Sequence, residues 1–433
     1  MARKCSLDVG LVLLAVAAAC GGSGGGPGAA PPSSPGGPNP GGSSGNPPGN
    51  SLATTVDLGP AALISAGMVV ANAAFVTITV CSPGSTTACQ TIDHVQVDTG
   101  STGLRILHEV LPSTVVPVPV VDPGSGHAVS ECGVFADGWT WGSLGMVDVS
   151  LGGRPLKSLV VQVIGDPASG TAPSACSSGN GPEEDTVASF GANALLGVGY
   201  YLQDCGTYCA DQVPSSGAPF YACSAGGGDQ GCTAIALATS SQPGNPVAQL
   251  SADNNGLTVQ FPATGTAPAA SLEGTLLFGV GTQADNDPGA AVFHLLGANG
   301  NLNTAYQGQN LDQSVIDSGS SAYYFPDSSI PTCPQGDPGE GFYCPSTAIP
   351  AMATLAGGIG ARSSVSFTIA NADTLFRERP SDTAFPDLAG PLPGSGLTAQ
   401  TFDWGLPFHF GRPVSVLFER RSLGATTGPA IGF

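Results

Sequence analysis

The chain has 433 residues, including 64 glycines and 38 prolines, and only 10% of its residues are charged. Its formal net charge is −20, with 11 lysines and arginines against 31 aspartates and glutamates. This balance argues against a nucleic-acid partner, because phosphate contacts need clustered basic residues. It argues for the same reason against adhesion to an anionic membrane surface. Short strands joined by glycine and proline turns suit this composition better than long amphipathic helices.

The N-terminus has the features of an export signal. Arg3 and Lys4 precede an apolar run at 9–19 that is too short to span a bilayer. Small residues then lead to Cys20, in a pattern similar to a bacterial lipoprotein signal. We therefore expect residues 1–19 to be a signal peptide and Cys20 to carry a lipid anchor. Gly21 after the cysteine favours the outer membrane of the cell envelope; an ordinary cleaved signal is the alternative.

A tether and a mostly-β domain are expected after the cysteine. Residues 20–50 contain little except Gly, Pro, Ser and Asn, cannot bury a core, and should be disordered. Runs typical of strands follow at 74–80, 94–97, 146–151, 158–164, 256–261 and 275–278. One short helix is expected near 349–356, with Pro350 in its first turn. The fold class is therefore all-β with a few short helices.

Ten cysteines remain when Cys5 and Cys20 are set aside, and an even number in an exported chain predicts disulfides. Closeness in sequence favours Cys81–Cys89 and Cys333–Cys344, and Cys132–Cys176 could close a longer loop. The pairing within the remaining cluster stays open, and a zinc site is its alternative. That cluster consists of Cys205, Cys209, Cys223 and Cys232.

Two segments about half the chain apart share one motif, an apolar residue followed by Asp-[Thr/Ser]-Gly-Ser. One is Asp98-Thr99-Gly100-Ser101 and the other is Asp317-Ser318-Gly319-Ser320. Their separation predicts a duplicated lobe, with residues 51–248 in the first copy and 249–433 in the second. Each lobe would present one aspartate.

Each motif is suited to hold a carboxylate. An apolar strand delivers the aspartate to a buried edge, and the glycine two residues later permits a tight turn. The neighbouring hydroxyls can orient the carboxylates or bond across the interface. Two such carboxylates a few ångströms apart share one proton, because like charges resist joint ionisation. One can then act as base on a water while the other polarises a carbonyl.

From about residue 70 to the C-terminus the sequence resembles the pepsin-like aspartic proteases. The two aspartate motifs carry the likeness, together with other segments in the family's order. The layout also resembles the proteobacterial lipoproteins grouped as DUF3443. The resemblance implies a bilobal pepsin-like fold with its active site in the interlobe cleft. The other segments are 75–80, 94–104, 139–143 (a flap hairpin), 194–199 (an apolar-apolar-Gly brace), 274–279 and 404–433.

The resemblance implies an aspartic endopeptidase with Asp98 and Asp317 as its catalytic pair. It implies a polypeptide substrate, no metal and no organic cofactor, and we expect a monomer. A non-catalytic envelope protein that binds peptides is the alternative. The residues implied to support the pair are Thr99, Gly100, Ser101, Ser318, Gly319 and Ser320, and those implied to lie in the flap are Trp141, Gly142 and Ser143.

Two positions depart from the family's pattern. Trp141 stands where the flap tyrosine is expected, and Arg105 stands where its tryptophan partner is expected. We expect the Arg105 guanidinium to pack on the Trp141 ring in a cation–π contact. Near the aspartates, its charge would lower the pKa values of the pair. An Arg105 side chain that points to solvent is the alternative.

Overall fold

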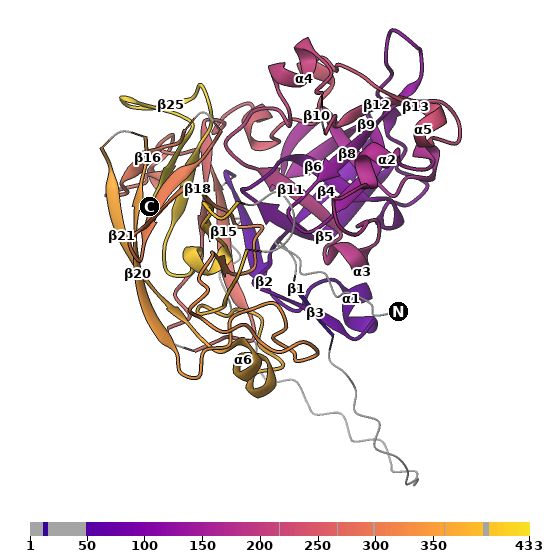
Figure 1. Ribbon diagram of the computed structural model, residues 1–433. Coiled ribbons are helices and arrows are strands. Elements are labelled where there is room, and N and C mark those ends of the chain that lie inside the picture. The colour runs from indigo at the N-terminus through magenta and orange to yellow at the C-terminus, as the bar shows by residue number, and fades with distance from the viewer. Residues whose placement is uncertain are drawn as a thin grey trace, which may run out of the picture.

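A computed structural model describes residues 12–15, 49–215, 217–265, 267–297, 299–358, 360–392 and 398–433. This part of the chain consists mainly of β-strands in two lobes (Figure 1), coloured indigo to magenta and orange to yellow. The expectation of a mostly-β fold with short helices is confirmed. Cys20 and nearly all of the predicted signal and tether lie outside the described residues. The exceptions are residues 49–50 of the tether and β1 (Val12–Ala15), whose backbone pairs with β3 (Met68–Ala71).

The first lobe and the junction between the lobes share one 16-stranded sheet. The strand β2 (Ser51–Val56) pairs with both β4 (Ala74–Cys81) and β15 (Leu272–Phe278) and so joins the first lobe to the junction. The strands of the first lobe are β4 (Ala74–Cys81), β5 (Cys89–Asp98), β6 (Thr102–Leu107), β7 (Val118–Pro119), β8 (Ala128–Val134), β9 (Trp139–Leu151), β10 (Arg154–Ile164), β11 (Ala194–Val198), β12 (Phe220–Cys223) and β13 (Cys232–Ala234). The strands at the junction are β2 (Ser51–Val56), β14 (Gly256–Gln260), β15 (Leu272–Phe278), β16 (Phe293–Leu295), β24 (Val414–Leu417) and β27 (Ala430–Gly432).

The second lobe is built on a 7-stranded sheet in the order β21-β20-β17-β18-β23-β19-β22. Its middle strand, β18, runs parallel to β23, as β5 runs parallel to β11 in the first lobe. The strands are β17 (Leu302–Tyr306), β18 (Gln309–Ile316), β19 (Tyr323–Tyr324), β20 (Ile349–Ala356), β21 (Arg362–Ile369), β22 (Ala389–Gly390) and β23 (Asp403–Trp404), with a separate hairpin of β25 (Ser422–Leu423) and β26 (Thr426–Thr427).

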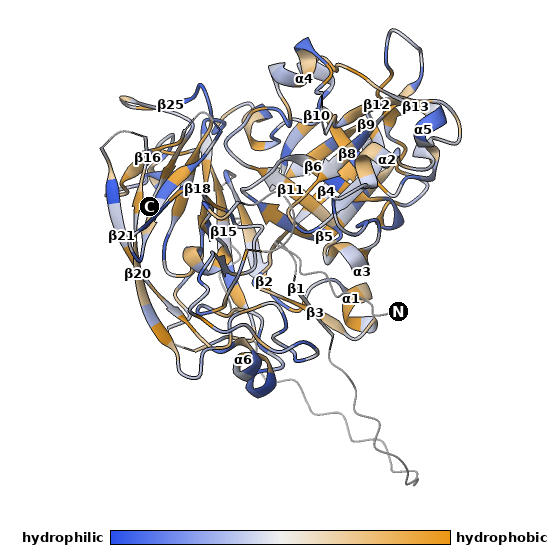
Figure 2. Ribbon diagram, in the orientation of Figure 1, coloured by the Kyte–Doolittle hydropathy of each residue, from blue (hydrophilic) through white to orange (hydrophobic). Residues whose placement is uncertain are grey.

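The α-helices of the described residues are short and lie outside the sheets. None of them is long and apolar enough to cross a membrane. Figure 2 shows apolar residues concentrated on the strands of both lobes, whereas α5 and α6 are largely hydrophilic. The helices are α1 (Ala61–Ser65), α2 (Ser174–Ser177), α3 (Val187–Phe190), α4 (Thr207–Asp211), α5 (Gly228–Gly231) and α6 (Ala372–Glu378).

Each lobe has its own core. In the first, aliphatic residues of the long strands dominate, and this cluster continues into the junction strands. In the second, aromatic side chains are much more common, and Phe402 stacks on Trp404 with 4.0 Å between ring centroids. Because Trp404 belongs to β23, this packing fixes a strand that borders the second aspartate.

All six expected strand segments lie largely or wholly within strands, but the expected helix at 349–356 is wrong. These residues form β20, which pairs with β21 along its whole length and with β17 at its end. Ala353 and Leu355 point into the core, so the apolar period is two rather than 3.6. Pro350 lies where β20 is paired with β21 alone, a place where its missing N–H is tolerated.

Five disulfides join the ten cysteines outside the N-terminal segment. The three expected pairs, Cys81–Cys89, Cys132–Cys176 and Cys333–Cys344, are all present. The open cluster resolves into two bonds, and the alternative of a zinc site there is wrong because a metal would need free thiolates. Such a set of disulfides is typical of exported proteins. The two further bonds are Cys205–Cys209 and Cys223–Cys232.

Candidate active site

The two aspartates of the repeated motif meet where the lobes face one another. β5 ends at Asp98, and β18 ends one residue before Asp317. Beside each motif runs a parallel strand with a glycine near its end. Gly197, the residue before the last of β11, pairs with Asp98, and Gly405 directly follows β23. A Cβ at Gly197 would lie 2.7 Å from a backbone carbonyl oxygen, and one at Gly405 would lie 2.2 Å from another. Only glycine therefore lets these strands brace the aspartate loops so closely.

The motif glycines bring the two carboxyl groups together. A Cβ on Gly100 would lie 2.6 Å from the carboxyl group of Asp317. A Cβ on Gly319 would lie 2.7 Å from Asp98 Oδ1. Each carboxyl group thus rests against the glycine of the opposite motif, an approach that a side chain on either glycine would block.

Thr99 and Ser318 join the two motifs by reciprocal hydrogen bonds. The N–H of Ser318 donates to Thr99 Oγ1 at 2.9 Å, and the N–H of Thr99 donates to Ser318 Oγ at 3.2 Å. Each hydroxyl also donates to a backbone carbonyl of the other lobe, that of Ile316 or Val97. Because both side chains are buried, these bonds fix the lobes relative to one another at the aspartates.

The two carboxyl groups differ in their donors. Asp98 accepts bonds from the N–H groups of Gly100 and Ser101 and from the Ser101 hydroxyl. Asp317 accepts one from the Gly319 N–H at 2.7 Å. Its second oxygen lies 3.1 Å from Ser320 Oγ, a hydroxyl that lies closer to another carboxylate. Three donors stabilise a negative charge on Asp98 better than the weaker set around Asp317 does.

Electrostatics strengthens this asymmetry. Burial raises the pKa of Asp317 well above its usual value, and the negative charges of Asp98 and Asp403 raise it further. Asp317 therefore holds a proton in a pH range in which an ordinary aspartate is ionised. The hydrogen-bond donors thus favour a negative charge on Asp98, and burial favours a proton on Asp317.

A cavity of about 580 Å³ opens over the pair. Residues of both lobes line it, including Asp98 and Asp317. The hairpin of β8 and β9 reaches over it, and residues 135–138 form the turn at its tip, closed by a bond from the Phe135 N–H to the Gly138 carbonyl. The space is large enough to hold several side chains of an extended peptide.

Comparisons with known proteins agree with this architecture. A family model described as "Protein of unknown function (DUF3443)" matches residues 46–433. The chain belongs to the DUF3443 family. Among solved structures, an aspartic proteinase from Irpex lacteus is similar over 88% of this chain and 96% of that chain, with a TM-score of 0.50 and 14% identity. The predicted pepsin-like fold is confirmed, and at this identity the likeness concerns the fold alone. A search of curated proteins finds no match.

Arg105 of this DUF3443 protein does not contact Trp141 as expected, and it does not point to solvent. Its side chain is 3% exposed, and its guanidinium lies over the Phe135 ring, 5.7 Å from the centroid. It donates to Glu131 at 2.9 Å and to Asp204 at 2.8 Å. Arg105 is not among the groups that shift the pKa of Asp317, so the expected lowering does not occur; that pKa is raised by burial and by the charges of Asp98 and Asp403.

The flap prediction at Trp141, Gly142 and Ser143 was also misplaced, because the hairpin turns several residues earlier. Trp141 is buried, donates from Nε1 to the Gly170 carbonyl, and packs against Tyr221. Ser143 donates to Asp166. None of the three predicted flap residues lines the cavity, whereas residues 133–137 do.

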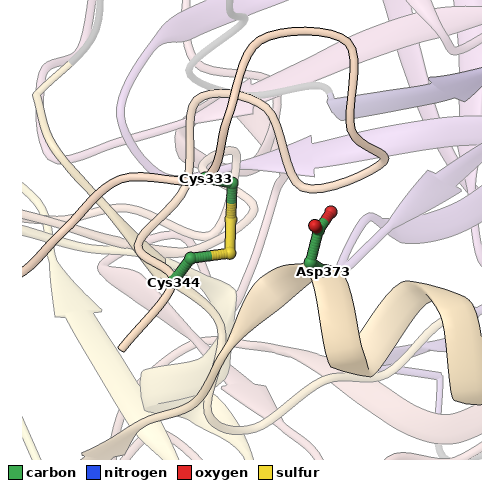
Figure 3. A group of neighbouring side chains, drawn as sticks. All are labelled: Cys333, Cys344 and Asp373. Atoms are coloured by element: carbon green, nitrogen blue, oxygen red, sulfur yellow. A yellow bond between two sulfur atoms is a disulfide. The ribbon is translucent and has the colours of Figure 1, made fainter. Parts of the chain in front are cut away.

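Metal ligands are not gathered in the described residues in a form that could bind an ion. The single group with suitable spacing consists of Cys333, Cys344 and Asp373. Figure 3 shows that the two sulfur atoms are bonded to one another, so neither is a thiolate. This group is a disulfide beside the start of α6.

Four residues of the site were missed by sequence reasoning. Phe135 is the aromatic residue of the flap tip, and Glu131 and Asp204 are the partners of Arg105. The fourth, Asp403, lines the cavity together with Asp98 and Asp317. A signal existed for two of them: Glu131 interrupts an apolar strand, and Asp403 precedes Trp-Gly where the first lobe has Leu195 before Leu-Gly.

Proposed function

We propose that this DUF3443 protein is an aspartic endopeptidase in which Asp98 and Asp317 activate water. The observation that supports the proposal is the close approach of the two carboxyl groups in the lining of one cavity. Each of them lies against the glycine of the opposite motif. A purely structural protein has no need for two matching loops that bring two aspartates together. The supporting roles of Thr99, Ser318 and the motif serines follow from the hydrogen bonds described above.

The asymmetry of the pair suggests a division of labour. Asp98, with three donors, is the base that takes a proton from the attacking water. Asp317, with its raised pKa, is the acid that gives its proton to the carbonyl oxygen of the scissile bond. The oxygen of the water then bonds to the carbonyl carbon. Transfer of the proton held by Asp98 to the amide nitrogen, with return of a hydroxyl proton of the intermediate to Asp317, lets the C–N bond break and leaves an amine and a carboxylic acid.

A peptide substrate would lie extended in the cavity, bonded to the β8–β9 hairpin in the manner of an added strand. The ring of Phe135 at the tip would cover it. We also propose that the protein is exported, acts as a monomer, and is held in the cell envelope by a lipid on Cys20. A Cys20→Ser variant should then leave the membrane fraction, and its retention there would contradict the anchor.

Cleavage of unfolded proteins and of a peptide library between about pH 3 and 7 tests the enzymatic proposal. Purified protein should cleave, pepstatin should inhibit it, and Asp98→Asn and Asp317→Asn should each abolish activity. Asp387→Asn is the matched control, a substitution of the same kind outside the cavity lining. No cleavage by folded, disulfide-bonded protein would overturn the proposal. Peptide binding without cleavage would then identify the non-catalytic alternative.

A further inference from the structure

A third carboxyl group lies beside the catalytic pair at a position where the first lobe has an apolar side chain. Leu195 lies on β11, two residues before the bracing glycine Gly197. Asp403 lies on β23, two residues before the equivalent Gly405. The two lobes are therefore alike in backbone and differ in charge at this position.

Asp403 is buried without a cation. Its side chain is 2% exposed, and no ion pair joins it in the described part of the chain. Oδ2 accepts a bond from the Ser320 hydroxyl at 2.5 Å, whereas Oδ1 has no partner there. The charged groups that act on it are the carboxyl groups of Asp98 and Asp317, and its neighbour across the strand is Tyr324. Burying a carboxylate in this way is costly unless it binds a proton.

The Ser320 hydroxyl connects this carboxyl group to the pair. Its oxygen lies 2.5 Å from Asp403 Oδ2 and 3.1 Å from Asp317 Oδ2, but it has one proton to donate. When Asp403 is ionised, Ser320 donates to Asp403 and Asp317 loses that donor. When Asp403 is protonated, it donates to Ser320, and Ser320 donates to Asp317.

We propose that Asp403 is a third carboxyl group of the pair's proton system, acting on Asp317 through Ser320, and that it lets the pair keep its shared proton closer to neutral pH. Asp403 is thus a positioning residue, and its effect on activity rests on the proposed function. Two effects act in the same direction. The negative charge of an ionised Asp403 repels a second negative charge on the pair. An ionised Asp403 also accepts the hydrogen bond from Ser320, which then cannot stabilise an ionised Asp317.

The titration behaviour of the two groups supports this view. Burial raises the pKa of Asp403 to about 7; the bond from Ser320 lowers it, and the charge of Asp98 raises it. The charge of Asp403 is in turn one cause of the raised pKa of Asp317. The protonation of Asp317 therefore depends on the charge of Asp403, and the protonation of both depends on the charge of Asp98.

Infrared titration of the folded protein between about pH 4 and 8 tests this, because it counts protonated carboxyl groups without requiring activity. The protonation of the pair at each pH is obtained by subtracting the titration curve of the Asp98→Asn, Asp317→Asn double variant from that of the wild type. This difference is measured with and without Asp403→Asn, which keeps the shape of the side chain and removes its charge. Asp387→Asn is the matched control, because burial also raises the pKa of Asp387.

The midpoint pH at which the pair loses its proton should be about one unit lower in Asp403→Asn than in the wild type. Where the protein cleaves peptides, the alkaline limb of kcat/KM should move down by the same amount. An unchanged midpoint, or an equal shift with Asp387→Asn, would overturn the inference. If nothing is cleaved, the proposed function fails while the titration still decides the role of Asp403. Should Asp403→Asn not fold, Asp403→Leu, which copies Leu195, takes its place.

Discussion

The Arg105 guanidinium lies over the ring of Phe135, and this contact joins β6, the strand that follows Asp98, to the tip of the β8–β9 hairpin, the flap. Arg105 is held in place by Glu131 on the flap strand β8 and by Asp204 beyond β11. Burial lowers the pKa of Arg105, but the charges of these two partners raise it above its usual value. The flap is therefore tied to the floor of the cavity by a buried ion cluster as well as by aromatic packing.

Loss of the guanidinium should destabilise the protein strongly. Arg105→Met removes the buried donor to Glu131 and Asp204 and leaves the Glu131 carboxyl group without that partner, which should cost about 1–3 kcal/mol in denaturant unfolding at pH 7. Arg377→Met is the control, because Arg377 is 55% exposed in its ion pair with Asp337 and its loss should cost less than about 1 kcal/mol. The double variant Arg105→Met, Glu131→Gln should regain part of the loss. Equal effects of the two arginine substitutions would contradict the assigned role.

The stability of the protein should fall as the pH rises from 5 to 8. Burial raises the pKa of Glu131 to about 8, although Arg105 lowers it. The folded state therefore holds a proton that the unfolded chain has already lost, and the resulting stability disappears as the pH rises toward 8. One such proton gives a slope of about 1.4 kcal/mol per pH unit in the free energy of unfolding.

Denaturant unfolding across this pH range checks the slope. Glu131→Gln cannot titrate, so its slope should be smaller than that of the wild type. Glu273→Gln, an exposed residue on β15, should leave the slope unchanged. A slope that Glu131→Gln does not alter would show that other groups cause the pH dependence.

The reciprocal bonds of Thr99 and Ser318 should matter for both stability and activity. Thr99→Ala leaves the Ser318 N–H buried without its acceptor, which should cost about 1–3 kcal/mol. Cleavage should fall as well, because the two aspartate loops are no longer fixed to one another. Thr99→Ser keeps the hydroxyl and should restore both. Thr79→Ala, on the exposed face of β4, should change stability by less than about 0.5 kcal/mol.

Local patterns predicted the parts of this site that depend on local structure. The two Asp-[Thr/Ser]-Gly-Ser motifs could be found because strand, aspartate and glycine follow one another directly. The contact of Arg105 with Glu131 could not, because it depends on how β6 and β8 are placed in one sheet. Asp403 was missed for the same reason, since β23 reaches β18 only after a long excursion of the chain. The flap tip was misplaced because Trp141 lies within β9, paired with β8, whereas the turn falls at residues 135–138, and the pairing of the two strands is not visible in the local sequence.

A methyl group on either motif glycine should separate the function of the site from the stability of the fold. In Gly319→Ala the new Cβ would lie 2.7 Å from Asp98 Oδ1 and would push this carboxyl group away from Asp317. A displacement of about 1 Å can reduce a rate by about 100-fold, so kcat should fall at least to that extent. Gly358→Ala is the matched control, because its Cβ would meet one backbone oxygen at 3.8 Å and nothing nearer. Full activity of Gly319→Ala would mean that catalysis does not require the close approach of the two carboxyl groups. Lost activity, with a far-ultraviolet spectrum and an unfolding midpoint close to those of Gly358→Ala, would show that the substitution acts on the site and not on the fold.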